Sequence, residues 1–361
     1  MAGPLHGLTI IEMAGLGPGP FAAMMLADHG AQMIRIERAG MIGVPNDPLL
    51  RSRRSIALDL RREECRDVVR KLAATADGLI EGYRPGVMER LGLGPDALLE
   101  ANPGLVYGRV TGWGQDGPLA QEAGHDINYL ALTGLLHGIG EKDRPPVPPL
   151  NLVGDYAGGG MMLAFAMVAA LLAVERGGTG QIIDVAMSDG AALTGALIYG
   201  LRAAGLWKDE RGSNLLDGGE ALYGCYACAD GKFLALGAIE PQFRRALLDG
   251  LKVVEGASRE VVAAAVASRS RDAWVEIFAG SDACVAPVLT MSEAPGHPHN
   301  AARSTFVEVD GVIQPAPAPR YSRTTTDPPT APRREGADGA AILAELGYDG
   351  AEVENILNRA Q

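Results

Sequence analysis

Cysteine and positive charge are both scarce in this chain of 361 residues. Its 4 cysteines are too few for the disulfide framework of a small secreted domain, so a reducing compartment, the cytoplasm, is expected. Its 44 acidic residues outnumber 32 lysines and arginines, for a formal net charge of -12. A chain without an overall basic field does not neutralise the phosphates of nucleic acid, which argues against general nucleic-acid binding.

Several catalytic and targeting motifs are also missing. The sequence has no Gly-x-Ser-x-Gly elbow and no Walker loop, so serine hydrolysis and P-loop chemistry lack support. Cys225 and Cys228 have half of a zinc-site spacing, but no second pair completes four ligands, and we expect no metal site. The first residues lack a charged-then-apolar signal or a transit peptide, and residues 358–361 are not a peroxisomal address. We therefore expect a cytoplasmic enzyme that does not enter a membrane.

The apolar pattern predicts an α/β fold with two domains. The 47% hydrophobic content suffices for a full core. Short apolar runs alternate with helical segments through the first 200 residues, which favours a Rossmann-like parallel sheet. We expect a large domain over residues 1–200 that the C-terminal segment 320–361 completes. A hairpin near residue 222 begins a smaller α+β domain over 221–313, with linkers at 201–220 and 314–335.

Residues 15–20, which read Gly-Leu-Gly-Pro-Gly-Pro, resemble a dinucleotide fingerprint after the first strand. Glu37 lies about where the ribose-binding acid would be, ~20 residues after the glycines. The third glycine position, however, is Pro20, and Pro18 and Pro20 remove two amide donors that a pyrophosphate needs. Nicotinamide binding is therefore disfavoured.

Arginines recur where the predicted strands end. In an open parallel sheet ligands bind beyond the carboxyl ends of the strands, so these side chains could meet the phosphates of a nucleotide-like anion. Any single one could equally be an ordinary solvated charge. The arginines concerned are Arg38, Arg51, Arg53, Arg54 and Arg84.

Two stretches carry the candidate chemistry. Residues 151–160 read Asn-Leu-Val-Gly-Asp-Tyr-Ala-Gly-Gly-Gly and lead into an apolar run over 161–174, so Asp155 is expected to cap a buried central helix. The glycines beside it allow close approach of another group. Upstream, the Gly-His-Asp run at 124–126 could open a second helix, with Asp126 as a first-turn anion. Each residue could simply cap its helix, but together His125 and Asp155 could face one substrate carbon from opposite sides.

Residues 124–129 (Gly-His-Asp-Ile-Asn-Tyr) and 151–155 (Asn-Leu-Val-Gly-Asp) resemble the α-methylacyl-CoA racemases of the family III CoA-transferase superfamily. The likeness extends over nearly the whole chain, including residues 17–20, 81–86, 111–114 and 237–243. It implies an interlocked homodimer and an isomerase of lipid and fatty acid metabolism that acts on 2-methylacyl-CoA. It implies no cofactor, since CoA is part of the substrate.

The resemblance also implies roles for individual residues. His125 and Asp155 would be the two bases, with Glu240 of the other subunit and Asn151 as their respective hydrogen-bond partners. Substrate or CoA contacts would come from a larger set that shares the family's motif positions. That set is Arg38, Ala57, Gly82, Tyr83, Arg84, Met88, Arg90, Gly124, Asp126 and Tyr129.

The expected reaction is 1,1-proton transfer through an enolate. Unperturbed His and Asp have pKa values near ~6.5 and ~3.9, so a protonated Asp155 beside a neutral His125 requires that the pKa of Asp155 be raised. Two alternatives stay open. A CoA-transferase would use Asp155 as a nucleophile that forms an acyl anhydride, and an acyl-CoA-binding protein would keep the cleft without catalysis. Met161, Met162 and Met187 could form an adaptable acyl surface or simply fill the core.

Overall fold

The computed structural model describes residues 3–40 and 44–358, which divide into two compact units. The large unit comprises Met1–Thr133, Leu150–Thr194 and Phe306–Gln361, and the small unit comprises Gly134–Pro149 and Gly195–Thr305. The chain therefore leaves the large unit twice and returns to it. The division differs from the expected boundaries, because residues 134–149 belong to the small unit and the hairpin at 306–315 belongs to the large one.

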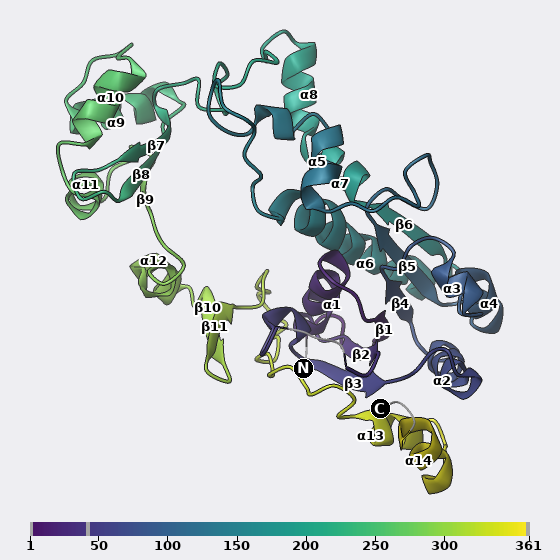
Figure 1. Cartoon of the computed structure of the whole chain (residues 1–361). Helices are drawn as coiled ribbons and strands as arrows, with labels where there is room; N and C mark the ends of the chain where they lie inside the picture. Colours follow the sequence, from purple (N-terminus) through teal and green to yellow (C-terminus); the bar gives the residue numbers. More distant parts are fainter. Residues whose placement is uncertain (1–2, 41–43, 359–361) are drawn as a thin grey trace. The chain divides into compact units, whose positions relative to one another are not determined.

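A six-stranded sheet with the order β3-β2-β1-β4-β5-β6 forms the centre of the large unit (Figure 1). Every neighbouring pair is parallel, which confirms the predicted Rossmann-like α/β fold. The strand order reverses between β1 and β4, and such a switch point is where open α/β sheets bind their ligands. The strands are β1 (Thr9–Met13), β2 (Gln32–Glu37), β3 (Arg53–Ala57), β4 (Gly78–Glu81), β5 (Val106–Thr111) and β6 (Ile182–Ala186).

Helices cover both faces of this sheet. On one face Ile10, Ile80 and Val106 pack against α1 (Pro18–Asp28) and α6 (Met162–Glu175). On the other face Ile11, Ile34 and Leu79 pack against a different set of helices. That set is α2 (Glu63–Ala73), α3 (Val87–Arg90), α4 (Pro95–Ala101), α13 (Gly339–Glu345) and α14 (Gly350–Asn358). Burial on both faces explains why the strands are almost continuously apolar.

The charged residues of the sheet are paired inside it. Glu12, which is 0% exposed in β1, accepts a hydrogen bond from Arg35 of β2, and its second oxygen lies 2.9 Å from Nε of Arg53 in β3. Arg51 is likewise buried and forms a bidentate pair with Asp28. A buried charge left without its partner is costly, so these side chains are committed to the fold.

This pairing corrects the expectation that the arginines near the strand ends converge on a ligand. Arg51 and Arg53 point into the protein, and Arg54 pairs with Glu345 of α13 at the surface. Arg38 and Arg84 are exposed and form no ion pair with any residue in the described ranges. Only these two of the five arginines are left for an anion.

The expected central helix is longer than predicted. A π-helical segment, η3 (Leu152–Met161), runs directly into α6, so the helical stretch spans Leu152–Glu175. By length and composition this stretch could cross a membrane, which for one helix is weak evidence, and 44% of its most apolar window is buried in the chain. After β6 the next helical stretch is interrupted at Gly195, giving α7 (Met187–Thr194) and α8 (Ala196–Ala203).

The small unit contains a three-stranded antiparallel sheet, which confirms the predicted hairpin. Its strands are β7 (Tyr223–Ala227), β8 (Phe233–Gly237) and β9 (Val285–Val288). They pack against α9 (Pro241–Leu251), α10 (Arg259–Val266) and α11 (Arg271–Phe278).

The remaining elements belong to both units. They are α5 (Asp126–Leu132), α12 (Pro298–Ala302), the strands β10 (Phe306–Val309) and β11 (Val312–Pro315), and the short 3-10 turns η1 (Pro48–Leu50), η2 (Leu136–Gly138) and η4 (Ala294–Gly296).

Candidate active site

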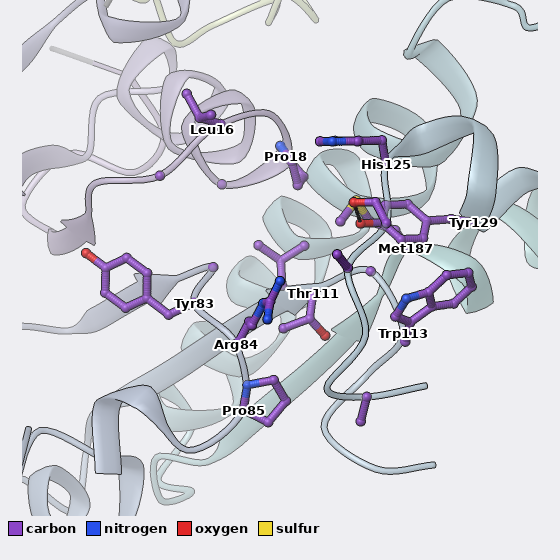
Figure 2. Close-up of a pocket in the computed structure, with 18 of the residues that line it drawn as sticks. Leu16, Pro18, Tyr83, Arg84, Pro85, Thr111, Trp113, His125, Tyr129 and Met187 are labelled. Atoms are coloured by element: carbon purple, nitrogen blue, oxygen red, sulfur yellow. Dashed lines mark hydrogen bonds between the residues drawn. The ribbon is translucent and has the colours of Figure 1, made fainter. Parts of the chain in front are cut away.

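A cavity of about 360 Å³ lies at the carboxyl ends of β1, β4 and β5, beside the switch point of the sheet. Met13 ends β1, the segment 82–85 follows β4, and Thr111 ends β5. Figure 2 shows Arg84, Thr111 and His125 around this space, with Pro18 at the start of α1 on one side. Six of the predicted site residues line it, namely Gly82, Tyr83, Arg84, Gly124, His125 and Tyr129.

The glycine-proline loop forms one wall of this cavity. Gly15, Leu16, Pro18, Gly19 and Pro20 line it, and Gly17 is the N-cap of α1. Pro18 and Pro20 have no amide hydrogen to offer a phosphate. The wall is therefore mainly apolar, and Leu16 is 86% exposed on it.

His125 occupies the N-cap position of α5, which confirms the helix predicted after the Gly-His-Asp run. Its backbone is extended, and its amide donates a hydrogen bond to Oδ1 of Asn128, 3.0 Å away. The imidazole is exposed and lines the cavity. The main chain of His125 is thus fixed, while its ring remains open to a substrate.

An aromatic pair supports the segment that carries His125. The ring of Tyr129 meets that of Trp113 edge to face, with centroids 4.9 Å apart, and its hydroxyl donates to the carbonyl of Gly124. Burial first, and then the charges of Asp155 and Asp126, raise the pKa of Tyr129. The pair therefore holds residue 124 directly before the histidine.

Asp155 lies in the first turn of η3, and the expectation that it caps the helix is wrong. The N-cap is Asn151, whose Nδ2 donates to Oδ2 of Asp155 over 3.2 Å. The start of α5 and η3 pack together, so His125 and Asp155 do lie on two neighbouring helix starts. A π-helix is rare and is frequently found at functional sites, because its wider turn displaces side chains from α-helical positions.

Glycines fix this π-helix against two other helices. A Cβ at Gly158 would lie 2.6 Å from the amide nitrogen of Ala191, and one at Gly190 would lie 1.9 Å from the carbonyl oxygen of Gly158. At Gly160 a Cβ would meet Phe21 of α1 at 2.7 Å. The close approach expected beside Asp155 is thus made by the backbones of α7 and α1, and it leaves η3 little freedom to move.

The carboxylate of Asp155 is half-buried beside the glycine-proline loop. A Cβ at Gly17 would lie 3.3 Å from its Oδ2. Burial, and to a lesser degree the charge of Asp126, raise the pKa of Asp155, whereas the Asn151 hydrogen bond and His125 oppose the rise. Asp155 does not itself line the 360 Å³ cavity, but Pro18 and Met187, which pack against Gly159 of η3, do.

Other predicted residues lie away from the cavity. Arg38 and Arg90 are exposed, and Ala57 ends β3. The side chain of Met88 is 0% exposed within the core, so it presents no surface to a ligand. Glu240 is the exposed N-cap of α9 in the small unit.

Several residues that line the cavity were not among the predicted site residues, including Leu16, Thr111 and Trp113. Thr111 ends β5, and Leu16 and Trp113 follow β1 and β5 within three residues, so their positions near strand ends were the available signal. Across the described ranges, no group of three or more His, Cys, Asp or Glu side chains could hold a metal ion.

The chain is similar to known proteins over nearly its whole length. The model of CoA-transferase family III matches residues 5–338. The α-methylacyl-CoA racemase of Mus musculus is 43% identical over 97% of this chain and 95% of its own length, and that of Homo sapiens is 40% identical over the same shares. The crystal structure of a CaiB/BaiF family protein from Brucella suis superposes with a TM-score of 0.83 at 26% identity, covering 96% of this chain and 100% of that one.

Proposed function

The chain belongs to CoA-transferase family III, and from that premise we propose that it is an α-methylacyl-CoA racemase. It would interconvert (2R)- and (2S)-2-methylacyl-CoA thioesters without a redox cofactor or a metal. The observation that carries the proposal is the placement of His125 and Asp155 on two packed helix starts, close enough that the charge of His125 acts on Asp155. The racemases of mouse and human are named for this activity.

The cavity suits the thioester end of an acyl-CoA. Arg84 is an exposed cation on its wall with no ion-pair partner in the described ranges, so it is available to the anionic part of CoA. Leu16 and Met187 supply apolar surface for the acyl chain, whose two poses a flexible thioether such as Met187 accommodates. Gly82, Tyr83, Gly124 and Tyr129 complete the proposed contacts.

The start of α5 offers stabilisation of the enolate. The first amides of a helix have no intrahelical acceptor and carry the positive end of the helix dipole. Here they follow His125 directly. A thioester oxygen placed there would accept hydrogen bonds that strengthen as it becomes an enolate oxygen, which lowers the barrier to removing the α-proton.

Proton transfer then needs one proton shared between two groups. One base removes the α-proton, the electron pair moves onto the thioester oxygen, and the other group delivers its proton to the opposite face of the carbon. The raised pKa of Asp155 brings its basicity closer to that of an imidazole, so either group can serve as the acid. Asn151 orients Asp155, and we assign Glu240 of a second subunit as the partner of His125.

A homodimer is therefore part of the proposal. One face of the η3–α6 stretch carries Met161, Phe165, Val168 and Leu172, at intervals of four, three and four residues, and they are between 38% and 73% exposed. Such a stripe on a helix normally packs against another element, and we assign a second copy of the chain to it.

Phe165→Glu should convert the dimer to a monomer in light scattering. A wild-type monomer at assay concentration would exclude this arrangement, and flotation with phosphatidylcholine vesicles would point to a membrane instead.

The activity is tested by incubating one enantiomer of a 2-methylacyl-CoA with the protein in D₂O, with no second carboxylic acid. We expect α-deuterium in the substrate and the appearance of both enantiomers, read by mass spectrometry and chiral chromatography. If no exchange occurs but an added free carboxylic acid receives the CoA, Asp155 is a nucleophile and the protein is a CoA-transferase. That second candidate is favoured by the family membership itself and by the position of Asp155 beside the open loop at Gly17.

A further inference from the structure

The carboxylate of Asp126 lies buried between the two helix starts of the proposed active site. It is 6% exposed, and its Oδ1 accepts a hydrogen bond from the backbone amide of Asp155 over 2.7 Å. Asp126 is also the first residue of α5, directly after His125. One side chain therefore connects the main chain at both candidate bases.

The chain at Gly154 is shaped to receive this side chain. A Cβ there would lie 2.6 Å from Oδ1 of Asp126 and 3.1 Å from its carbonyl oxygen. Any residue larger than glycine before Asp155 would push the start of α5 away from η3 and lengthen the hydrogen bond. The glycine and the aspartate thus form a matched pair.

The second oxygen of Asp126 has an electrostatic consequence. Oδ2 is buried and has no hydrogen-bond partner among the described residues, so no donor offsets the negative charge on that side. Asp126 and His125 are the charged groups of the large unit that act on Asp155, and they act in opposite directions. Tyr129 of α5 is the neighbouring titratable group that Asp155 affects in turn. Asp189 of α7, which also packs against η3, is an exposed acid and is not among the groups that shift the pKa of Asp155.

We propose that Asp126 is a positioning residue, whose carboxylate holds the backbone of Asp155 in register with His125 so that the two bases face one carbon. The resemblance implies a substrate contact for Asp126. In the structure its carboxylate is used inside the protein, where Oδ1 accepts from the amide of Asp155. This inference rests on the proposed racemase activity and extends it.

Two substitutions separate the hydrogen bond from the charge. Asp126→Asn keeps an acceptor oxygen for the amide of Asp155 and removes the charge, whereas Asp126→Ala removes both. For Asp126→Ala we expect kcat to fall ~10²-fold with a much smaller change in KM, because a displacement of about 1 Å at a reacting group can cost that much. Asp126→Asn should retain more of kcat than the alanine variant.

A purely structural role of Asp126 would leave the pH dependence of kcat unchanged, so the pH profile tests the proposed role. The two bases, His125 and Asp155, are active when they hold one proton between them, so the acid limb of the pH profile follows the protonation of Asp155. Since the charge of Asp126 raises the pKa of Asp155, Asp126→Asn should move this limb to lower pH. Asp189→Asn is the matched control, because Asp189 is an exposed first-turn acid on α7, which packs against the same π-helix. Its profile should equal that of the wild type.

The outcomes distinguish this inference from the proposed function. If the wild type incorporates no α-deuterium, the racemase proposal fails first. If the wild type is active but Asp126→Ala retains most of its kcat, or Asp126→Asn leaves the acid limb in place, the positioning role is excluded. If Asp126→Ala does not fold, the acid limb of Asp126→Asn decides alone. A lower thermal midpoint with an unmoved limb would show that Asp126 only stabilises the fold.

Discussion

The two helix starts that carry His125 and Asp155 are held in different ways. The start of α5 is fixed by side chains, with Asn128 accepting from the amide of His125 and Tyr129 donating to the carbonyl of Gly124. The η3 helix is fixed by backbone contacts with α7 at Gly158 and Gly190, and at its start by the hydrogen bond from the amide of Asp155 to Asp126. As a result the imidazole is exposed, whereas the carboxylate is half-buried and its pKa is raised.

Because they are held differently, two groups of unequal basicity can serve one reaction. Histidine is the side chain whose ordinary pKa lies closest to neutral pH. An aspartate needs a partly desolvated place to hold a proton at all. The glycine-rich packing of η3 against α7 and α1 supplies that place.

The largest expected effect comes from removing either base. His125→Gln and Asp155→Asn should each lower the rate of racemisation by ~10²–10⁴-fold, the usual contribution of a general acid or base. Because each variant keeps one base, each should still exchange the α-proton of one enantiomer with D₂O, and the two variants should prefer opposite enantiomers. Deuterium incorporation into each pure enantiomer measures this.

If both variants exchanged the same enantiomer, His125 and Asp155 would lie on the same side of the α-carbon. That result would contradict their assignment to opposite faces. Circular dichroism should show that both variants remain folded. Neither side chain belongs to the buried core, since His125 is exposed and Asp155 is half-buried.

A smaller effect is expected from the contact between η3 and α7. Gly190→Ala would place a Cβ 1.9 Å from the carbonyl oxygen of Gly158, and overpacking of this kind typically costs about 1–3 kcal/mol. The free energy of unfolding from urea titration should fall by that amount, and racemisation should fall with it because η3 carries Asp155.

Gly200→Ala provides the control, since Gly200 also lies inside a helix but a Cβ there would meet no atom within 4 Å. Alanine is favoured over glycine in a helix by about 0.5–1 kcal/mol, so this variant should be as stable as the wild type or more so. Equal losses at both positions would show that the close contact is not responsible.

The smallest effect concerns the pH dependence. The hydrogen bond from Asn151 lowers the pKa of Asp155, so Asn151→Ala should raise that pKa further. The acid limb of the rate profile should therefore move to higher pH, opposite to the shift expected for Asp126→Asn. A shift of the two variants in the same direction would contradict the electrostatic description of the site.

Much of the fold follows from local pattern. The alternation of short apolar strands and helices predicts the parallel sheet that the structure contains. The Gly-His-Asp run predicts the start of α5 because a helix start has a local signature. The two stretches suggested His125 and Asp155 as a pair, the resemblance implied their roles as the two bases, and the structure places them on adjacent helices.

Other features depend on contacts between distant residues. Arg51 and Arg53 indicate a cluster of cations near one strand. Only the packed sheet shows that Asp28 pairs with the first and Glu12 with the second. The register of a π-helix cannot be read from Asp155 alone, because the extra residue per turn is stabilised by how closely α7 and α1 approach. Asp155 was therefore expected to be an N-cap, whereas the structure places it in the first turn of η3.

The alternating α/β pattern, the proline-blocked glycine loop and the two stretches with titratable groups can be read from the chain alone, because each depends on residues near one another in the sequence. Packing settles which arginines remain free, how Asp126 joins the two helix starts and why the pKa of Asp155 is raised. These properties arise from burial and from contacts between distant segments, such as the hydrogen bond between Asp126 and Asp155 across 29 residues, which local pattern does not encode.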